Sequence, residues 1–92
     1  MDYPSDADID FIKNYSLEKL GPIPLIDHIY DLWHWEDCFT CEYGKLELHT
    51  GGWSGNEDII DALMPTEFWL FYWMKSERGG HYYFEIPEKE PA

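Results

Sequence analysis

The stretch CFTCEYGKLELH, residues 38–49, decides the fold class of this chain. Apolar and polar residues alternate on both sides of Gly44, and in the second run Leu46 and Leu48 stand between polar residues. A period of two is typical of a strand that buries one of its faces. Two such runs around a short turn with glycine predict a β-hairpin.

Upstream of the hairpin, the residues have the spacing and the end signals of helices. One apolar series follows i, i+3, i+4 and i+7 and predicts an amphipathic helix: Ile26, Ile29, Tyr30 and Trp33. Pro24 suits the first turn of this helix. Ser5 is a favourable N-cap residue and acids follow it, so an earlier helix is expected there. Ser16 predicts a further helical turn that ends at Gly21.

Downstream of the hairpin, one more helix and a second hairpin are expected. Ser54 and Glu57 match a capping box, so a helix is expected to start there and to end before Pro65. Residues 68–75 are rich in aromatic side chains and predict a strand. Residues 77–80, Glu-Arg-Gly-Gly, predict a hairpin loop, and residues 81–86 predict the returning strand.

A strand over residues 68–75 would be apolar on both faces. One face would carry Phe68, Leu70, Tyr72 and Met74, and the other Trp69, Phe71 and Trp73. Because an apolar face has to be covered, the second one is expected to lie against the chain itself, a second copy or a partner protein. The aromatic content of 18% supports this, since it exceeds what a small core must hold.

These elements predict a single domain over residues 1–92, with flexible ends at residues 1–4 and 87–92. The expected class is α+β, in the order α-α-β-β-α-β-β. Because hairpins join antiparallel neighbours, we expect a four-stranded antiparallel sheet with the helices packed mainly on one face.

The chain is strongly acidic, with 19 Asp and Glu against 6 Lys and Arg and a formal net charge of −13. This charge repels phosphate and anionic lipid, so direct binding to nucleic acid or to a membrane is not expected. A basic protein is the expected partner, while the same acidity also favours solubility. The N-terminus has no apolar signal segment and residues 68–74 are too short to span a bilayer, so a cytoplasmic location is expected.

Cys38 and Cys41 form a CxxC pair, which is too few cysteines for a disulfide framework. With His34 or His49 they are a weak candidate for a zinc site. Against this, sulfurs three residues apart in a regular strand point to opposite faces. A small zinc-binding module or metal-dependent enzyme that uses these residues is therefore an alternative hypothesis, and the main hypothesis includes no cofactor.

Three further groups of residues have both a functional and a structural interpretation. Two pairs would converge in a metal or acid–base site if their strands are neighbours: Glu47 with His49, and His81 with Glu85. Asp27, Asp31 and His34 share a helical face, which is also expected of a solvated surface. The glycine-rich residues 50–57 are similar to an anion-binding loop, but the acids at its end favour a structural turn. No pattern of a nucleophile with its base stands out, so enzymatic activity is not expected.

Four motifs lie within about residues 45–86: GGWSGNEDII at 51–60, FW at 68–69, YW at 72–73 and RGGHYYFEI at 78–86. With them the chain resembles small uncharacterised accessory proteins of tailed bacteriophages and prophages. The resemblance implies a protein that works in the cytoplasm of a bacterial host. Small acidic phage proteins that act by binding resemble inhibitors of host defence, including those of the anti-CRISPR type.

We therefore expect a non-enzymatic interaction protein that binds and inhibits a basic, nucleic-acid-handling host protein or nucleoprotein complex. Carboxylates on a rigid scaffold can act as a nucleic-acid mimic, because they imitate a row of phosphates. The candidate partner-binding residues are Asp6, Asp8, Asp10, Asp27, Asp31, Glu36 and Asp37, with Trp69 and Trp73 as aromatic anchors. A homodimeric structural or regulatory phage protein is the third hypothesis.

Overall fold

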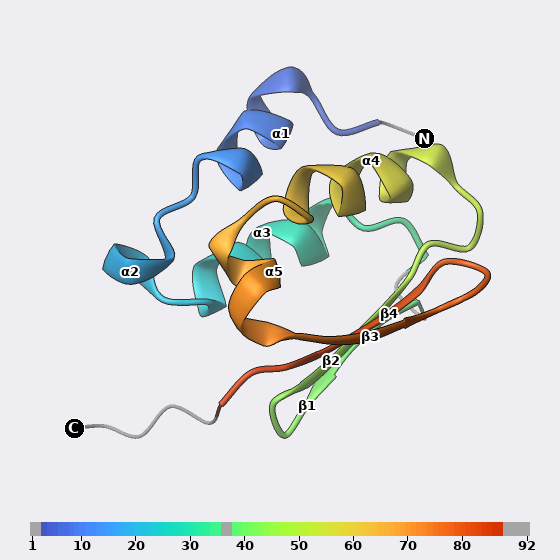
Figure 1. The fold of residues 1–92 in the computed structure, drawn as a ribbon. Coiled ribbons are helices and arrows are strands. Elements are labelled where there is room, and N and C mark those ends of the chain that lie inside the picture. The colour runs from blue at the N-terminus through green and yellow to red at the C-terminus, as the bar shows by residue number, and fades with distance from the viewer. Residues whose placement is uncertain (1–2, 36–37, 88–92) are drawn as a thin grey trace.

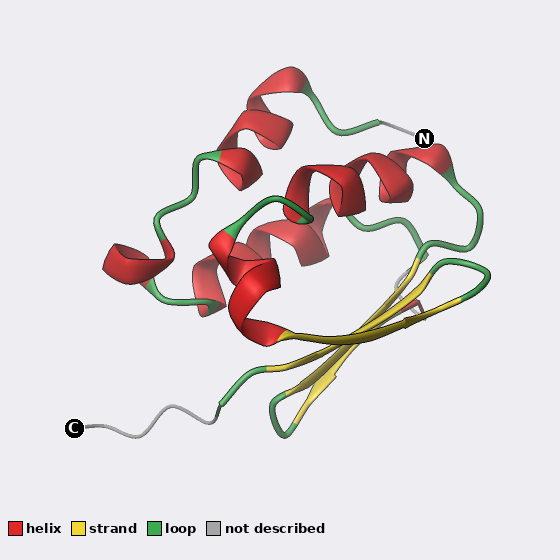
Figure 2. Ribbon diagram, in the orientation of Figure 1, coloured by secondary structure: helices red, strands yellow, loops and turns green. Residues whose placement is uncertain are grey.

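The computed structural model describes residues 3–35 and 38–87, which form two layers, with helices on one face of a twisted sheet (Figure 1). In chain order the elements are α1 (Asp6–Lys13), α2 (Leu17–Leu20), α3 (Ile23–Leu32), β1 (Phe39–Glu42), β2 (Lys45–His49), α4 (Ser54–Leu63), α5 (Glu67–Tyr72), β3 (Trp73–Glu77) and β4 (His81–Glu85). Figure 2 shows the separation of helices and strands into these layers. The α+β class is therefore confirmed. No helix among the described residues is long and apolar enough to cross a membrane.

The four strands pair antiparallel in the order β1-β2-β4-β3, as the hairpin signals predict. Tyr43 and Gly44 join β1 to β2, and their φ angles of 53° and 79° suit a two-residue turn that follows the twist of a hairpin. The two hairpins lie side by side, with β2 and β4 in the centre of the sheet. Residues on β2 and β4 therefore become neighbours, although these strands belong to different hairpins and no local sequence pattern predicts their pairing.

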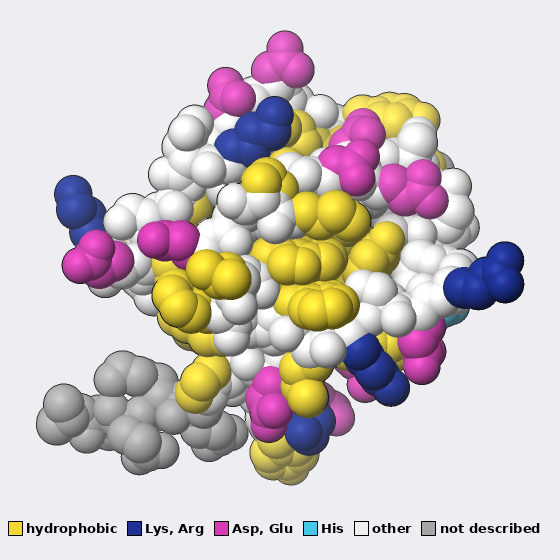
Figure 3. Space-filling view, in the orientation of Figure 1, with side chains coloured by type: hydrophobic (Ala, Val, Ile, Leu, Met, Phe, Trp, Pro, Cys, Tyr) yellow, Lys and Arg dark blue, Asp and Glu magenta, His cyan; other side chains and the backbone are white. Residues whose placement is uncertain are grey.

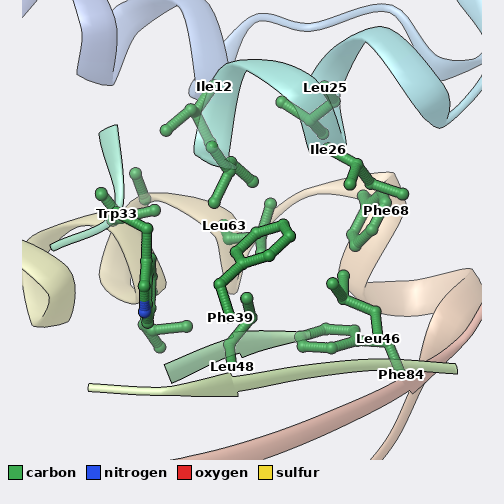
Figure 4. Packing of buried hydrophobic residues seen from close by; sticks show 14 of the residues in the cluster. Ile12, Leu25, Ile26, Trp33, Phe39, Leu46, Leu48, Leu63, Phe68 and Phe84 are labelled. Carbon is green, nitrogen blue, oxygen red and sulfur yellow. The ribbon is translucent and has the colours of Figure 1, made fainter. Parts of the chain in front are cut away.

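The core lies between the sheet and the helices (Figure 4). Leu46, Leu48 and Phe84 extend from the central strands into it and are almost completely buried. Buried helical residues pack in the same cluster: Ile12, Leu25, Ile26, Leu63 and Phe68. At about 25 cal/mol per Å² of apolar surface removed from water, this shared core is the main favourable term that holds the two layers together.

The structure corrects the expected strand at residues 68–75. Residues 67–72 form α5, and β3 begins only at Trp73. Thr66 caps the helix, because its side-chain oxygen accepts a hydrogen bond from the Trp69 N–H. The helical turn buries Phe68 in the core and leaves Leu70 76% exposed, so tertiary burial outweighs the local preference for a strand. The second apolar strand face that would need cover does not form.

The structure confirms Ser5 as the N-cap of α1 but not the capping box expected at Ser54. In α1, Ser5 Oγ accepts from the Asp8 N–H (3.1 Å) and the Asp8 carboxylate accepts from the Ser5 N–H (3.0 Å), a reciprocal capping box. The expected capping box at Ser54 is wrong. Trp53 is the N-cap of α4, and because Ser54 is already inside the helix, its hydroxyl hydrogen-bonds the Tyr3 hydroxyl instead (2.9 Å).

Candidate functional site

The acidic residues are divided unevenly between the two layers. Helices α1–α5 carry ten acids and two lysines; the acids are Asp6, Asp8, Asp10, Glu18, Asp27, Asp31, Glu57, Asp58, Asp61 and Glu67. Residues 39–49 and 73–85, which make up the strands and their turns, carry four acids (Glu42, Glu47, Glu77 and Glu85) and three basic residues (Lys45, Lys75 and Arg78). Within the described residues, the negative charge therefore lies mainly on the helical layer.

The acids predicted to bind a partner differ in solvent exposure and in the hydrogen bonds that they make within the protein. Asp6 and Asp10 are exposed on α1, and Asp27 and Asp31 are exposed on α3. Asp8 is partly buried and occupied in the capping box, where hydrogen bonds from Ser5 hold the pKa of its carboxyl below the usual value. The other two predicted acids, Glu36 and Asp37, lie outside the described residues.

Three acids that the sequence analysis did not include lie on α4, which packs beside α1 (Figure 1). Glu57, Asp58 and Asp61 are all exposed. Their signal was present in the sequence, because they alternate with Ile59, Ile60 and other buried positions at helical spacing. Only the packing of α1 beside α4 brings their helix next to that of Asp6 and Asp10, because the two groups are at least 47 positions apart in the sequence.

The two predicted anchors, Trp69 and Trp73, stack on each other, with ring centroids 6.0 Å apart and an interplanar angle of 12°. Trp69 is partly buried and its ring meets Phe84 edge-on. Trp73 is 43% exposed, and its indole N–H donates to the Ser76 hydroxyl (2.9 Å). Trp69 is thus held by the core, while Trp73 presents part of its ring to solvent.

Exposed apolar side chains continue from this pair along α5 and the start of β3. Leu70, Phe71 and Met74 are 76%, 65% and 56% exposed. Figure 3 shows hydrophobic side chains gathered over α5 and the start of β3, with acidic side chains over α1 and α4 on the same side of the molecule. We call Trp69, Leu70, Phe71 and Trp73 the α5 patch; Met74 is not part of it, because it lines a second pocket with Glu47, Lys75 and Tyr83 of the sheet.

A groove of about 510 Å³ opens beside α5, between the α2–α3 turn, the β1–β2 turn and the end of β4. Its lining is mainly apolar, including Leu20, Ile23, Tyr72 and Ile86. Cys41 is exposed at the mouth of the same groove, and partial desolvation there raises the pKa of its thiol, with a smaller contribution from the negative charge of Asp27. Because Tyr72 belongs to α5, the groove lies next to the helix that carries most of the α5 patch.

The structure does not assemble the cysteine-based metal site. Cys38 is partly buried against the core, Cys41 is exposed, and both are free thiols. Among residues 3–35 and 38–87, no group of three or more His, Cys, Asp and Glu side chains is placed to hold a metal ion. His34 is held elsewhere, because its backbone pairs with the Asn56 side chain and its ring packs against Trp53.

The sequence predicted that the two His and Glu pairs would meet only if their strands are neighbours, and β2 and β4 are neighbours in the sheet. His49 of β2 lies directly opposite His81 of β4, and their Nδ1 atoms are 2.7 Å apart. Glu47 joins them, with Oε1 3.4 Å from His49 Nε2. Glu85 does not, because it lies opposite Lys45 and pairs with its ammonium group at 3.7 Å. Three of the four predicted side chains therefore converge on the outer face of the sheet.

The glycine-rich loop at residues 50–57 uses its polar groups within the protein. Asn56 is fully buried, and its amide donates to the carbonyl oxygens of His34 (3.1 Å) and Thr50 (3.2 Å) while its oxygen accepts from the His34 N–H (3.0 Å). The Thr50 N–H donates to the Gly80 carbonyl (2.9 Å). The loop is therefore a junction between α3, α4 and the β3–β4 turn, although the capping box expected within it does not form.

Comparisons of this chain with protein-family models, with curated proteins and with solved structures found no match. The resemblance to phage accessory proteins stays a prediction. Function is therefore inferred from the surfaces of this chain: the acidic helical layer, the α5 patch and the histidine pair.

Proposed function

We propose that this protein is a non-enzymatic binding protein that engages a basic protein partner through its helical layer. The observation that carries the proposal is the position of the exposed α5 patch on the same side of the molecule as the acids of α1 and α4 (Figure 3). The outer face of the sheet offers no comparable surface, because its acids are nearly balanced by basic residues.

An apolar centre with a charged surround is the usual anatomy of a binding surface. Well-packed aromatic anchors at the centre supply most of the affinity, and the charged rim excludes poorly matched partners. Trp73, which is partly exposed and rests on Trp69, has the features of such an anchor. The net charge of −13 adds long-range attraction for a basic protein, and salt weakens that attraction.

The narrower form of the proposal is that the partner is a nucleic-acid-handling protein of a bacterial host, inhibited in the manner of an anti-CRISPR protein. It is supported by the resemblance of residues 45–86 to phage proteins and by the rigid helices that carry the carboxylates of α1 and α4. A mimic of nucleic acid occupies the groove that phosphates would fill. DNA or RNA must then compete with this protein for the partner.

A homodimer formed through the α5 patch is the second candidate, favoured by the exposure of Leu70 and Phe71. The charge of the helical layer opposes it, because two copies that meet through this face bring like charges together. Light scattering at micromolar concentrations separates the candidates. A monomer mass is the result expected for a protein that binds a different partner.

The proposal is tested by capture of proteins from a nuclease-treated bacterial lysate on the immobilised protein, at low and at high salt. We expect a basic protein that is retained at low salt and released at high salt. Trp73→Ala should reduce its retention at least tenfold, as expected for removal of a central anchor. Tyr43→Asn is the matched control, since it removes an 89% exposed ring from the β1–β2 turn and asparagine tolerates the positive φ.

Two results would contradict the proposal. One is that no basic protein is retained at either salt concentration. The other is that Trp73→Ala and Tyr43→Asn, both confirmed as folded by circular dichroism, retain the captured protein equally well.

A further inference from the structure

The histidine pair on the outer face of the sheet has no role in the proposed function, because the binding surface lies on the opposite layer. His49 and His81 stand directly opposite each other on the central strands. The backbone next to them is fixed on both sides. The Trp33 indole N–H donates to the His49 carbonyl (3.2 Å), and the Thr50 N–H donates to the Gly80 carbonyl (2.9 Å). The two rings therefore face each other from a rigid frame.

The Nδ1 nitrogens of the two rings lie within hydrogen-bond distance, 2.7 Å apart. A neutral imidazole has one N–H and one bare nitrogen, so without a cation one Nδ1 must donate to the other. A divalent zinc-like ion binds histidine nitrogens at about 2.0–2.1 Å. Two nitrogens on one such ion are about 2.8–3.4 Å apart at right-angled to tetrahedral geometry, given that bond length. The two Nδ1 atoms therefore need to separate by about 0.1–0.7 Å to admit the ion, from the same geometry.

Glu47 sits where a ligating histidine usually finds a supporting carboxylate. Its Oε1 lies 3.4 Å from His49 Nε2, on the far side of the ring from His81. A carboxylate there favours the proton on Nε2 and leaves the lone pair of Nδ1 free for a metal ion. Metal-binding histidines commonly have this arrangement, in which the carboxylate orients the ring rather than touching the ion.

A second carboxylate lies beside His81, because Glu77 of β3 is its partner in the sheet register. The Tyr83 hydroxyl donates to Glu77 Oε1 (3.0 Å), and the Lys75 ammonium group pairs with Glu77 Oε2 at 3.4 Å. The Glu47 carboxylate beside the pair favours a cation between the rings, whereas the charge of Glu77 is partly offset by Lys75.

We propose that His49 and His81 together bind one divalent transition-metal ion through their Nδ1 atoms, with Glu47 as a positioning residue. No third His, Cys, Asp or Glu side chain completes the set among the described residues, so water supplies the other ligands. Imidazole ligands suit copper, nickel and zinc, and affinity for such a site follows the general order in which Cu²⁺ binds more tightly than Ni²⁺ or Zn²⁺.

The test is calorimetric titration of the full, untagged chain with Cu²⁺, Ni²⁺ and Zn²⁺ at neutral pH. We expect one ion per chain, with Cu²⁺ bound most tightly. His49→Gln and His81→Gln should each weaken binding at least tenfold. Glu47→Gln should weaken it by about tenfold, in the range measured for other supporting carboxylates. His28→Gln and His34→Gln are matched controls, because they remove the same side chain away from the sheet, and should leave binding unchanged.

A second measurement needs no variant and therefore does not depend on their folding. Paramagnetic Cu²⁺, added in substoichiometric amounts, should broaden the imidazole proton signals of His49 and His81 before those of His28 and His34. Equal broadening of all four histidines would overturn the proposal. So would binding that survives both His49→Gln and His81→Gln, or the absence of binding when metal and protein are both micromolar. Because none of these results involves the helical layer, failure here leaves the proposed function standing.

Discussion

Gly52 and Gly80 have almost the same backbone conformation, with φ angles of 81° and 83°, but very different surroundings. A Cβ atom at Gly52 meets nothing within 4 Å, whereas one at Gly80 lies 2.2 Å from Thr50 Oγ1. We expect Gly52→Ala to lower the free energy of unfolding by about 1 kcal/mol, the cost of a positive φ. Gly80→Ala should lower it by about 2–4 kcal/mol, because the clash adds to that cost. Urea denaturation measures both, and equal losses would show that Gly80 does not approach Thr50.

Asp8 makes the stability of α1 depend on pH. Hydrogen bonding from Ser5 holds the pKa of Asp8 in the folded protein below its usual value of 3.8. A carboxyl with a lower pKa in the folded state stabilises the fold above pH 3.8, and that contribution is lost as the pH falls through the folded pKa. Asp8→Asn should therefore lower stability at neutral pH and reduce the loss of stability on acidification. Asp6→Asn, which removes a charge from the same turn without breaking the capping box, is the control for thermal unfolding measured across acidic pH.

At the scale of the element, a helix and a strand over residues 68–72 would bury different side chains. In a strand, Phe68 and Leu70 share a face, as do Trp69 and Phe71; in the helix, Phe68 is buried while Leu70 and Phe71 are exposed. We expect Phe68→Ala to lower the free energy of unfolding by about 3–5 kcal/mol, and Phe71→Ala to change it by less than about 0.5 kcal/mol. Chemical denaturation checks both. A large loss for Phe71→Ala would indicate that residues 68–72 form the strand that the sequence predicts.

Local signals predicted the elements that depend on neighbouring residues, and failed where distant residues decide. The alternation around Tyr43 and Gly44 predicted the first hairpin, and Ser5 predicted the start of α1. The aromatic run 68–75 is compatible with a strand, and only the core that receives Phe68 makes it helical. The meeting of His49 with His81 could be stated only as a condition, because strand order is set by tertiary packing.

The site residues show the same division. The acids of α1 and α3 were predicted as partner-binding residues from their charge. The acids of α4 join the proposed surface only through the packing of α1 beside α4, and these helices are far apart in the sequence. Trp69 and Trp73 were predicted to lie on the same face of one strand. They do lie together, but through the stacking of a helical residue on the first residue of β3.

For the whole molecule, the proposed function requires that the position of the acids on the helical layer, rather than the net charge of the protein, determines binding of a basic partner. Two variants with equal net charge separate these explanations. Asp10→Lys with Asp61→Lys reverses two exposed charges on the packed pair α1 and α4. Glu42→Lys with Glu85→Lys reverses two exposed charges on the sheet.

The most direct measurement is the retention of the captured basic partner by these two variants and by the unmodified protein at low salt. We predict that the helical variant loses most of the retained partner, while the sheet variant keeps nearly all of it. Equal loss in both variants would mean that only net charge attracts the protein that is captured. Full retention by the helical variant would contradict the assignment of the binding surface to α1, α4 and the α5 patch.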